Sequence, residues 1–417
     1  MNVKPDAPHD VTKVLRVLHL ASVPFRPEEG VSRAVTSLAG AMHHVESHLA
    51  ADVPVGEDFS GLHQLRHWRP ERVLVSRELN RIVDHVKPDV VHLHGGILVS
   101  LLALAPSLRA VPVVATIYQL LPVPRKELGI RQVFDAQNSS IRPARIIASG
   151  FAGTPLARHL FKTGRIEAVC TPDPRVAARL HGLGPVVMAR GGATTSELRA
   201  SWSADPTIGF AGRAEPGRGV EDLIQAFSLL LRRLPTARLR LMLLPGPAAQ
   251  RWQEEYAHTP NIEISVGVTT DFHQELAKCQ VVALPFRIPA TITPPLVASE
   301  AMAVGVPVVA NDLSCIQPLI RSGVNGVLAD DSNPEALARA LFEVVHDKSR
   351  WTALSDAART TIETEWCWSG AAQATSGAYA EALRRRHRRQ GTTTAAPSVD
   401  HFVDNPITAS PTLHGHG

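Results

Sequence analysis

Short apolar runs alternate with longer amphipathic segments between Val14 and about Glu365. The runs are dense in Val and Ile and lack a strict alternation with polar residues, which is typical of parallel strands covered on both faces. Val14–Leu20 is predicted as the first of these strands, and Gly30–Met42, where apolar residues recur at helical spacing, as the helix that follows it. Further strands are predicted at residues 90–94, 112–117, 144–148, 168–171 and 185–189. The pattern predicts one Rossmann-like α/β domain over residues 14–190.

A stretch rich in Gly, Ser and Thr at residues 191–203 interrupts this alternation and is predicted to be an interdomain linker. The alternation then starts again and predicts a second Rossmann-like domain over residues 204–365. Its strands are predicted at 207–212, 239–244, 262–266, 281–285, 306–310 and 326–329, and its helices at 220–234, 270–279, 294–304 and 334–345. Two such runs predict two doubly wound parallel-sheet domains that face each other across a cleft.

The two ends of the chain lie outside these domains. Residues 1–13 form an N-terminal extension, residues 366–389 are predicted as a closing helix, and residues 390–417 lack periodicity and are predicted to be disordered. The closing helix ends in the run Arg384–Arg389, which carries five positive charges, more than the net charge of +4 of the whole chain. We interpret this run as a solvated helix end, with attraction to anionic lipid as the alternative. Because the basic charge is confined to one run, a general nucleic-acid binder is disfavoured.

Composition favours a globular protein of the cytoplasm. The 417 residues are 44% hydrophobic and 20% charged. The longest charge-free apolar stretch, Gly95–Ser107, is shorter than the ~20 residues that cross a bilayer, so no transmembrane segment is expected. Peripheral contact with the inner face of the membrane remains an expectation. The four cysteines form no CxxC motif, which favours reduced thiols over a disulfide framework or a zinc site.

The loop Gly212–Gly219 is the first candidate for chemistry. It reads Gly-Arg-Ala-Glu-Pro-Gly-Arg-Gly and lies between a predicted strand and a predicted helix. Glycines allow a ligand to approach the backbone closely, and the free N–H groups at a helix start attract anions. Arg213 and Arg218 add two cations with forked donors that suit phosphate oxygens. A tight turn with two solvated arginines is equally compatible with this spacing.

The second candidate is the helix predicted to begin at Pro294, with Thr293 as its N-cap. Glu300 lies about two turns inside this otherwise apolar helix. A buried carboxylate needs a partner, and a sugar diol is a partner that can hydrogen-bond to both of its oxygens. An arginine or a backbone N–H of the same domain is the alternative partner.

The first domain offers two weaker candidates. His92 and His94 share one face at the end of a predicted strand, where ligands sit in open α/β sheets, although structural histidines are the alternative. No third ligand follows at metal spacing, and the chain has no Asp-x-Asp motif, so no metal site is expected. The turn Glu28-Glu29-Gly30 suits either a phosphate- or sugar-facing loop or a solvated acidic turn. The missing GxGxxG fingerprint disfavours a nicotinamide dinucleotide site.

In this order and spacing, the motifs resemble those of the retaining glycosyltransferases of family 4, which have the GT-B fold and use nucleotide-activated sugars. The loop with Arg213 and Arg218 is similar to the family's Gly-Arg…Lys-Gly loop, whose cations hold the donor diphosphate. The segment Glu300–Ala310 is similar to the family's most recognisable C-terminal segment. The resemblance implies that Glu300 binds the nucleotide ribose. The other implied residues are Gly212, Thr293 and Pro294 on the donor side, and Gly30 and His94 on the acceptor or sugar side.

Three positions depart from the family's pattern. Ile292 stands where the family usually has a glutamate that contacts the donor sugar, and Tyr118 stands where it has an active-site histidine. Arg218 replaces the diphosphate lysine and keeps its charge. We therefore expect Arg213, Arg218 and Tyr118 to be the catalytic residues, with Ile292 on the sugar side of the site.

The resemblance implies a metal-independent enzyme without cofactors that moves a sugar from a nucleotide-diphosphate donor, with retention, to a hydroxyl of an unidentified acceptor. The acceptor is a glycan, a lipid-linked molecule or a small molecule. A catalytically silent GT-B protein that binds a nucleotide sugar or a partner is the alternative, because Ile292 and Tyr118 depart from the pattern. A nucleotide-sugar epimerase is less favoured, because no acid/base carboxylates can be assigned to the cleft.

Overall fold

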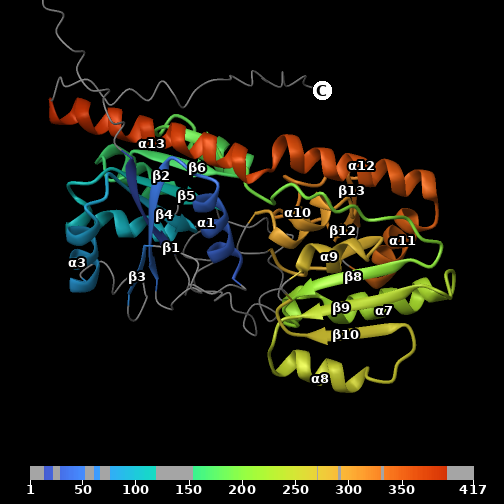
Figure 1. The fold of residues 1–417 in the computed structure, drawn as a ribbon. Helices are drawn as coiled ribbons and strands as arrows, with labels where there is room; N and C mark the ends of the chain where they lie inside the picture. The colour runs from blue at the N-terminus through green and yellow to red at the C-terminus, as the bar shows by residue number, and fades with distance from the viewer. Residues whose placement is uncertain are drawn as a thin grey trace, which may run out of the picture.

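The computed structural model describes residues 14–21, 29–51, 61–65, 76–118, 154–269, 271–289, 293–329 and 333–391. These residues form two all-parallel sheets, one in each half of the molecule (Figure 1). The predicted fold class, two doubly wound α/β domains that face each other, is confirmed. The predicted strand at 144–148, the N-terminal extension and the tail from residue 392 onward lie outside the described residues. No helix among the described residues has both the length and the apolar character needed to cross a bilayer.

The first sheet has the strand order β3-β2-β1-β4-β5-β6-β7. Its strands are β1 (Leu15–Ala21), β2 (Val45–Ala51), β3 (Leu62–Gln64), β4 (Val90–Gly95), β5 (Val113–Ile117), β6 (Ala168–Thr171) and β7 (Val186–Met188). Its helices are α1 (Gly30–Gly40), α3 (Arg77–Val86), α6 (Pro174–Leu180), the 3-10 helices η1 (Ile97–Leu104) and η2 (Pro106–Leu108), and a helix at 154–162. Because the chain returns from β3 to pair β4 with β1, the strand order reverses between β1 and β4. Ligands of open α/β sheets bind at such a switch point.

The second sheet has the strand order β10-β9-β8-β11-β12-β13. Its strands are β8 (Thr207–Gly212), β9 (Arg238–Leu243), β10 (Ile262–Val266), β11 (Val281–Leu284), β12 (Val308–Asn311) and β13 (Gly326–Ala329). Its helices are η4 (Pro216–Arg218), α7 (Val220–Leu231), α8 (Pro247–Glu255), α9 (Phe272–Ala277), α10 (Leu296–Ala303), α11 (Pro334–Val345) and α12 (Lys348–Glu365). The switch point lies here between β8 and β11, which pair in parallel.

The start of α10 differs from the prediction. The helix begins at Leu296 and has Pro295 as its N-cap, so Thr293 is not a cap and Pro294 is not the first helical residue. The reason is the Pro-Pro pair, since a residue that precedes a proline is disfavoured in the helical region of backbone space. Thr293 and Pro294 both precede a proline, and the helix can start only after the second one.

The chain crosses between the two domains twice, and the two crossings run side by side. The backbone N–H of Ala193 donates to the carbonyl of Trp366 at 3.3 Å, and Ala193 pairs with Cys367 in an isolated parallel bridge. After this point α13 (Trp368–Gln390) runs back over the first domain, where it contacts α1 and strands β5 to β7 (Figure 1). The first domain is therefore covered in part by the end of the chain.

The arginine run at the end of α13 is docked onto the first domain. Arg385, Arg386 and Arg389 lie within 4.0 Å of the Glu167 carboxylate, which is 1% exposed. Burial raises the pKa of Glu167, and the three arginines oppose this shift. The interpretation of the run as a solvated helix end is thus wrong for these three residues. A buried carboxylate without its counterions would be costly, and no feature of the local sequence indicates where that carboxylate lies.

Removal of a counterion from the buried carboxylate should destabilise the protein. We expect Arg385→Gln to lower the free energy of unfolding by about 1 kcal/mol, because the buried charge of Glu167 would then keep only two of its three arginines. Thermal or urea denaturation measures the effect. Glu343→Gln is the matched control, since Glu343 pairs with Arg350 at 3.0 Å on the surface and should cost under about 0.5 kcal/mol. Equal stability of the two variants would contradict the docking of α13 through Glu167.

Candidate functional site

The loop after β8 is pressed against the segment that follows β11, at the switch point of the second sheet. Gly219 has a positive φ of 69°, and a Cβ at this position would overlap the carbonyl oxygen of Pro285. Gly212, the last residue of β8, also has a positive φ, 147°. Only glycine suits both positions without strain, so the sequence pattern of this loop has a direct physical cause.

An ion pair inside the domain fixes this loop. Arg287, which follows β11, binds the Asp222 carboxylate of α7 with two hydrogen bonds of 2.7 Å each. The backbone N–H of Arg287 also donates to the carbonyl of Gly217 at 3.0 Å. The start of α7 and the loop before it are therefore held in a defined position beside the end of β11.

The two arginines of the loop have different surroundings. The guanidinium of Arg218 lies over the ring of Phe286, 4.7 Å from its centroid, and forms no ion pair with any residue in the described part of the chain. The pKa of Arg218 is lowered, mainly by burial. The guanidinium of Arg213 donates to the Glu29 carboxylate at 2.6 Å, and Glu29 belongs to the first domain. The alternative of a turn with two solvated arginines is therefore wrong for Arg213.

Glu300 lies on α10 and is 8% exposed. One of its oxygens pairs with Arg33, which belongs to α1 of the first domain. The second oxygen, Oε2, is buried and finds no hydrogen-bond partner among the described residues. The same is true of the hydroxyl of Thr293, which lies just before α10 and is 1% exposed. The alternative that an arginine of the same domain binds Glu300 is wrong, because its partner comes from across the interdomain boundary.

One turn of α1 contacts both Arg213 and Glu300 of the second domain. Glu29 is the N-cap residue of α1, Gly30 is its first residue, and the N–H of Arg33 donates to the carbonyl of Glu29 at 3.0 Å. Glu29 and Arg33 are four residues apart and therefore lie on one side of the helix. From the sequence, Glu29 is predicted only as part of a turn that is either a phosphate- or sugar-facing loop or a solvated acidic turn, and Arg33 is not predicted at all. Their opposite charges at helical spacing are the signal that could have drawn attention to them.

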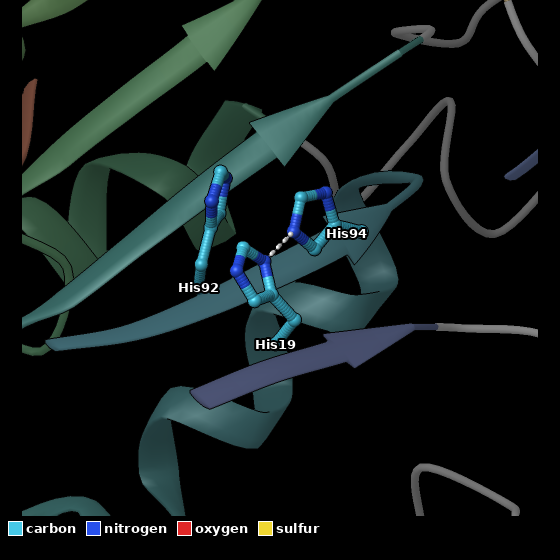
Figure 2. A group of neighbouring side chains, drawn as sticks. All are labelled: His19, His92 and His94. Carbon is cyan, nitrogen blue, oxygen red and sulfur yellow. Dashed lines mark hydrogen bonds between the residues drawn. The ribbon is translucent and has the colours of Figure 1, made fainter. Parts of the chain in front are cut away.

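Three buried histidines meet at the switch point of the first sheet. His92 and His94 lie on β4, and His19 lies beside them on β1 (Figure 2). All three are 0% exposed, and His19 Nδ1 lies 3.0 Å from His94 Nε2. Burial lowers the pKa of His19 to about 3 and holds the pKa values of His92 and His94 well below their usual range. The rings therefore form a neutral hydrogen-bonded cluster at neutral pH.

The sequence predicts no metal site because no third ligand follows His92 and His94, but the fold brings a third histidine to them. His19 is the third potential ligand, since the possible ligand atoms of the three rings lie within 4.8 Å of one another. His92, however, already uses both ring nitrogens, which lie 2.7 Å from the hydroxyls of Tyr379 and Thr116. A cation would have to displace one of these hydrogen bonds, and the cluster includes no carboxylate to balance a divalent charge. The donor set thus fits a hydrogen-bonded network better than a metal centre.

Two predicted site residues of the first domain, the catalytic candidate Tyr118 and the sugar-side candidate His94, are buried. Tyr118 is 6% exposed, and its hydroxyl lies 3.4 Å from His94 Nδ1, so both side chains face the histidine cluster. Burial raises the pKa of Tyr118, which keeps its hydroxyl protonated. Ile292, which is also predicted on the sugar side, lies outside the described residues. The structure therefore brings Gly30, Arg213, Arg218 and Glu300 to the interdomain boundary, and Tyr118 and His94 into the core.

Residues 205–347 match the profile of the family described as glycosyl transferases group 1. This segment is a group 1 glycosyltransferase domain. It contains the loop with Arg213 and Arg218 and the helix with Glu300, so the resemblance read from these motifs is confirmed. A D-inositol 3-phosphate glycosyltransferase from Xylanimonas cellulosilytica is 34% identical over 193 residues, which are 44% of each chain. The matches with the first three relatives cover between 40% and 54% of their length.

Solved structures share the arrangement of the glycosyltransferase domain and the first domain. A sucrose-phosphate synthase from Thermosynechococcus elongatus has a TM-score of 0.66 at 15% identity and covers 89% of this chain and 100% of its own. The HepE protein of Anabaena, solved in complex with UDP, has a TM-score of 0.65 at 15% identity over 87% of this chain and 99% of its own. The predicted GT-B fold is thus confirmed.

The histidine cluster should make the stability of the protein depend on pH. An unfolded histidine binds a proton near pH 6.5, whereas the three folded histidines resist protonation far below that pH. The unfolded chain binds more protons in this window, so the free energy of unfolding should fall as the pH falls from about 7 to about 4. Each histidine contributes up to about 1.4 kcal/mol per pH unit. Urea denaturation at a series of pH values measures this slope.

His19→Gln should reduce the pH dependence of the free energy of unfolding by the equivalent of about one proton taken up on unfolding, because one of the histidines that resist protonation is removed. His181→Gln is the control, since His181 is exposed, and its slope should equal that of the unmodified protein. A His19→Gln slope that matches the unmodified one would show that the cluster does not resist protonation.

Proposed function

We propose that this protein transfers a sugar from a nucleoside-diphosphate donor to an acceptor hydroxyl, with retention of the anomeric configuration. The glycosyltransferase domain at 205–347 supports the reaction class. The structural neighbour solved with UDP supports a nucleotide-sugar donor. The sequence relatives of the present chain are named for D-inositol 3-phosphate, so this compound is the first acceptor to be tried.

The observation that carries the proposal is the set of polar groups left without partners at the second switch point. Glu300 Oε2 and the hydroxyl of Thr293 are buried and unpartnered among the described residues. Such groups cost free energy unless a ligand satisfies them. Arg213 and Arg218 lie in the loop of the same switch point and match a diphosphate in charge. A nucleoside diphosphate supplies hydroxyls to Glu300 and negative charge to Arg218, which has no ion pair among the described residues, and to Arg213 in addition to Glu29.

In the proposed reaction the bond between the anomeric carbon and the leaving diphosphate breaks, and a bond to the acceptor oxygen forms on the same face. The leaving phosphate oxygen takes the proton of the acceptor hydroxyl, so no protein nucleophile is required. Arg213 and Arg218 stabilise the negative charge that develops on the diphosphate, which is the main electrostatic contribution to such a reaction. Because these two permanent cations supply the positive charge, we propose that transfer needs no metal ion.

We propose that the protein works in the cytoplasm, which is a reducing compartment. The four cysteines are all free thiols, three of them buried and Cys367 half-buried, and no disulfide stabilises the fold.

A catalytically silent protein that binds a nucleotide sugar is the second candidate. The burial of Tyr118 and His94 favours it, because the first domain then offers neither side chain to a transferred sugar. Binding without transfer would separate this candidate from the first.

A panel of UDP-, GDP-, ADP- and TDP-sugars tests the donor class. At least one should raise the melting temperature, because a ligand that binds only the folded state stabilises it. The same sugar should then be transferred or hydrolysed at a rate that EDTA does not change. Stabilisation by none of the four would contradict the proposed function, and loss of turnover in EDTA would contradict its metal independence.

Substitutions separate the roles of the two charged groups. Arg213→Ala should lower turnover by a factor of about 10² or more, because transition-state charge is no longer neutralised. Glu300→Gln should weaken nucleotide binding by about tenfold, because a charged hydrogen-bond acceptor for the ribose is lost. Calorimetry and steady-state kinetics measure the two effects. Near-normal turnover of a folded Arg213→Ala protein would contradict the assignment of the diphosphate site.

A further inference from the structure

Arg33 is a residue of the first domain that binds a functional residue of the second. It lies in the first turns of α1 and pairs with Oε1 of Glu300 on α10. Its guanidinium also lies 5.9 Å from the ring centroid of Phe272, at the start of α9. Two elements of the second domain thus hold one arginine of the first.

The pairing leaves one carboxylate oxygen fixed and the other free. Arg33 takes Oε1, whereas Oε2 is buried and unpartnered in the part of the chain that is described. We propose that Arg33 is a positioning residue, which orients Glu300 so that Oε2 accepts a hydrogen bond from the nucleotide ribose. This inference rests on the proposed function and extends it, because it assigns part of the nucleotide-binding task to the first domain.

The helical turn that carries Arg33 also contacts the loop of the proposed diphosphate site. Arg33 and Glu29 share one turn of α1, and Glu29 binds Arg213 of the loop that holds the proposed diphosphate. The ribose end and the diphosphate end of the site are therefore both contacted by the same helical turn. An approach of the two domains brings both contacts into place together, so the orientation of Glu300 depends on the interdomain arrangement.

A different role for Arg33 makes the opposite prediction. If its guanidinium merely filled the place of the ribose, its removal would free both oxygens of Glu300 and nucleotide binding would become tighter. If Arg33 bound the diphosphate directly, its removal would weaken the binding of inorganic diphosphate as much as the binding of a nucleoside diphosphate. A positioning role requires weaker nucleoside diphosphate binding and unchanged inorganic diphosphate binding.

Isothermal titration calorimetry on the full chain tests these roles. The probe is whichever of UDP, GDP, ADP and TDP binds the unmodified protein most tightly, with inorganic diphosphate as the probe that lacks a ribose. Arg33→Gln should weaken binding of the nucleoside diphosphate by about 3- to 10-fold, no more than Glu300→Gln does, and should leave the affinity for inorganic diphosphate within about twofold of the unmodified value. Arg33→Lys should recover most of the loss, because it restores the cation. Arg81→Gln, an exposed arginine on α3, is the control that should bind normally.

The double variant Arg33→Gln/Glu300→Gln decides whether Arg33 acts through Glu300. It should bind no more weakly than Glu300→Gln alone, because a positioning residue has no effect once the residue it positions is gone. Additive losses, tighter binding by Arg33→Gln, or an equal loss for inorganic diphosphate would each overturn the inference. If none of the four nucleoside diphosphates binds the unmodified protein, the proposed function itself fails, and this inference fails with it. Melting temperatures confirm that each variant is folded.

Discussion

A parallel sheet must be covered on both faces, and the first domain obtains part of its cover from the far end of the chain. Helix α13 places Trp368 and Tyr379 in the same buried cluster as Val17 of β1 and Tyr118 beyond β5. The end of this helix is fixed by its arginines, which surround Glu167. The two chain crossings therefore lie together, and the position of α1 relative to α10 depends on this return. Leu296 of α10 lies in the same buried cluster, next to the charged contacts between the domains.

These contacts are reciprocal in charge. The first domain supplies the carboxylate of Glu29 and the guanidinium of Arg33, and the second supplies Arg213 and Glu300. Each charge is withdrawn partly from water, and each finds an opposite charge across the boundary. The attraction within such partly buried pairs is largely offset by the cost of withdrawing the charges from water, so each pair adds little net stability. Such weak pairs can rearrange when a charged ligand enters, and yet they orient the side chains beforehand.

The sequence predicted the elements whose signals are local. The strands at 207–212 and 262–266 and the helix at 334–345 have the predicted bounds, because apolar runs and the Asn-Pro start of α11 are visible in a short window. Strands β2 and β3 were missed, since the polar residues of β2 and the three-residue length of β3 give no apolar run. Of the candidate site, the glycine-arginine loop and Glu300 could be proposed from sequence. Their partners could not, because contacts such as that of Arg33 with Glu300 depend on the tertiary arrangement.

The two switch points share one topology and differ in chemical content. In the first, the space beside the strand ends is filled by three neutral histidines whose hydrogen bonds run to Tyr118, Thr116 and Tyr379. In the second, the corresponding space holds permanent charge and buried polar atoms that have no hydrogen-bond partner among the residues the structure describes. Neutral rings that bond to one another favour rigidity, although Nε2 of His19 is buried without a hydrogen-bond partner among the described residues. Permanent charges, in contrast, favour a charged ligand. The same strand reversal thus supports packing in one domain and the proposed binding in the other, so the fold alone does not locate the site, and the permanent charge beside the strand ends is what distinguishes the second domain.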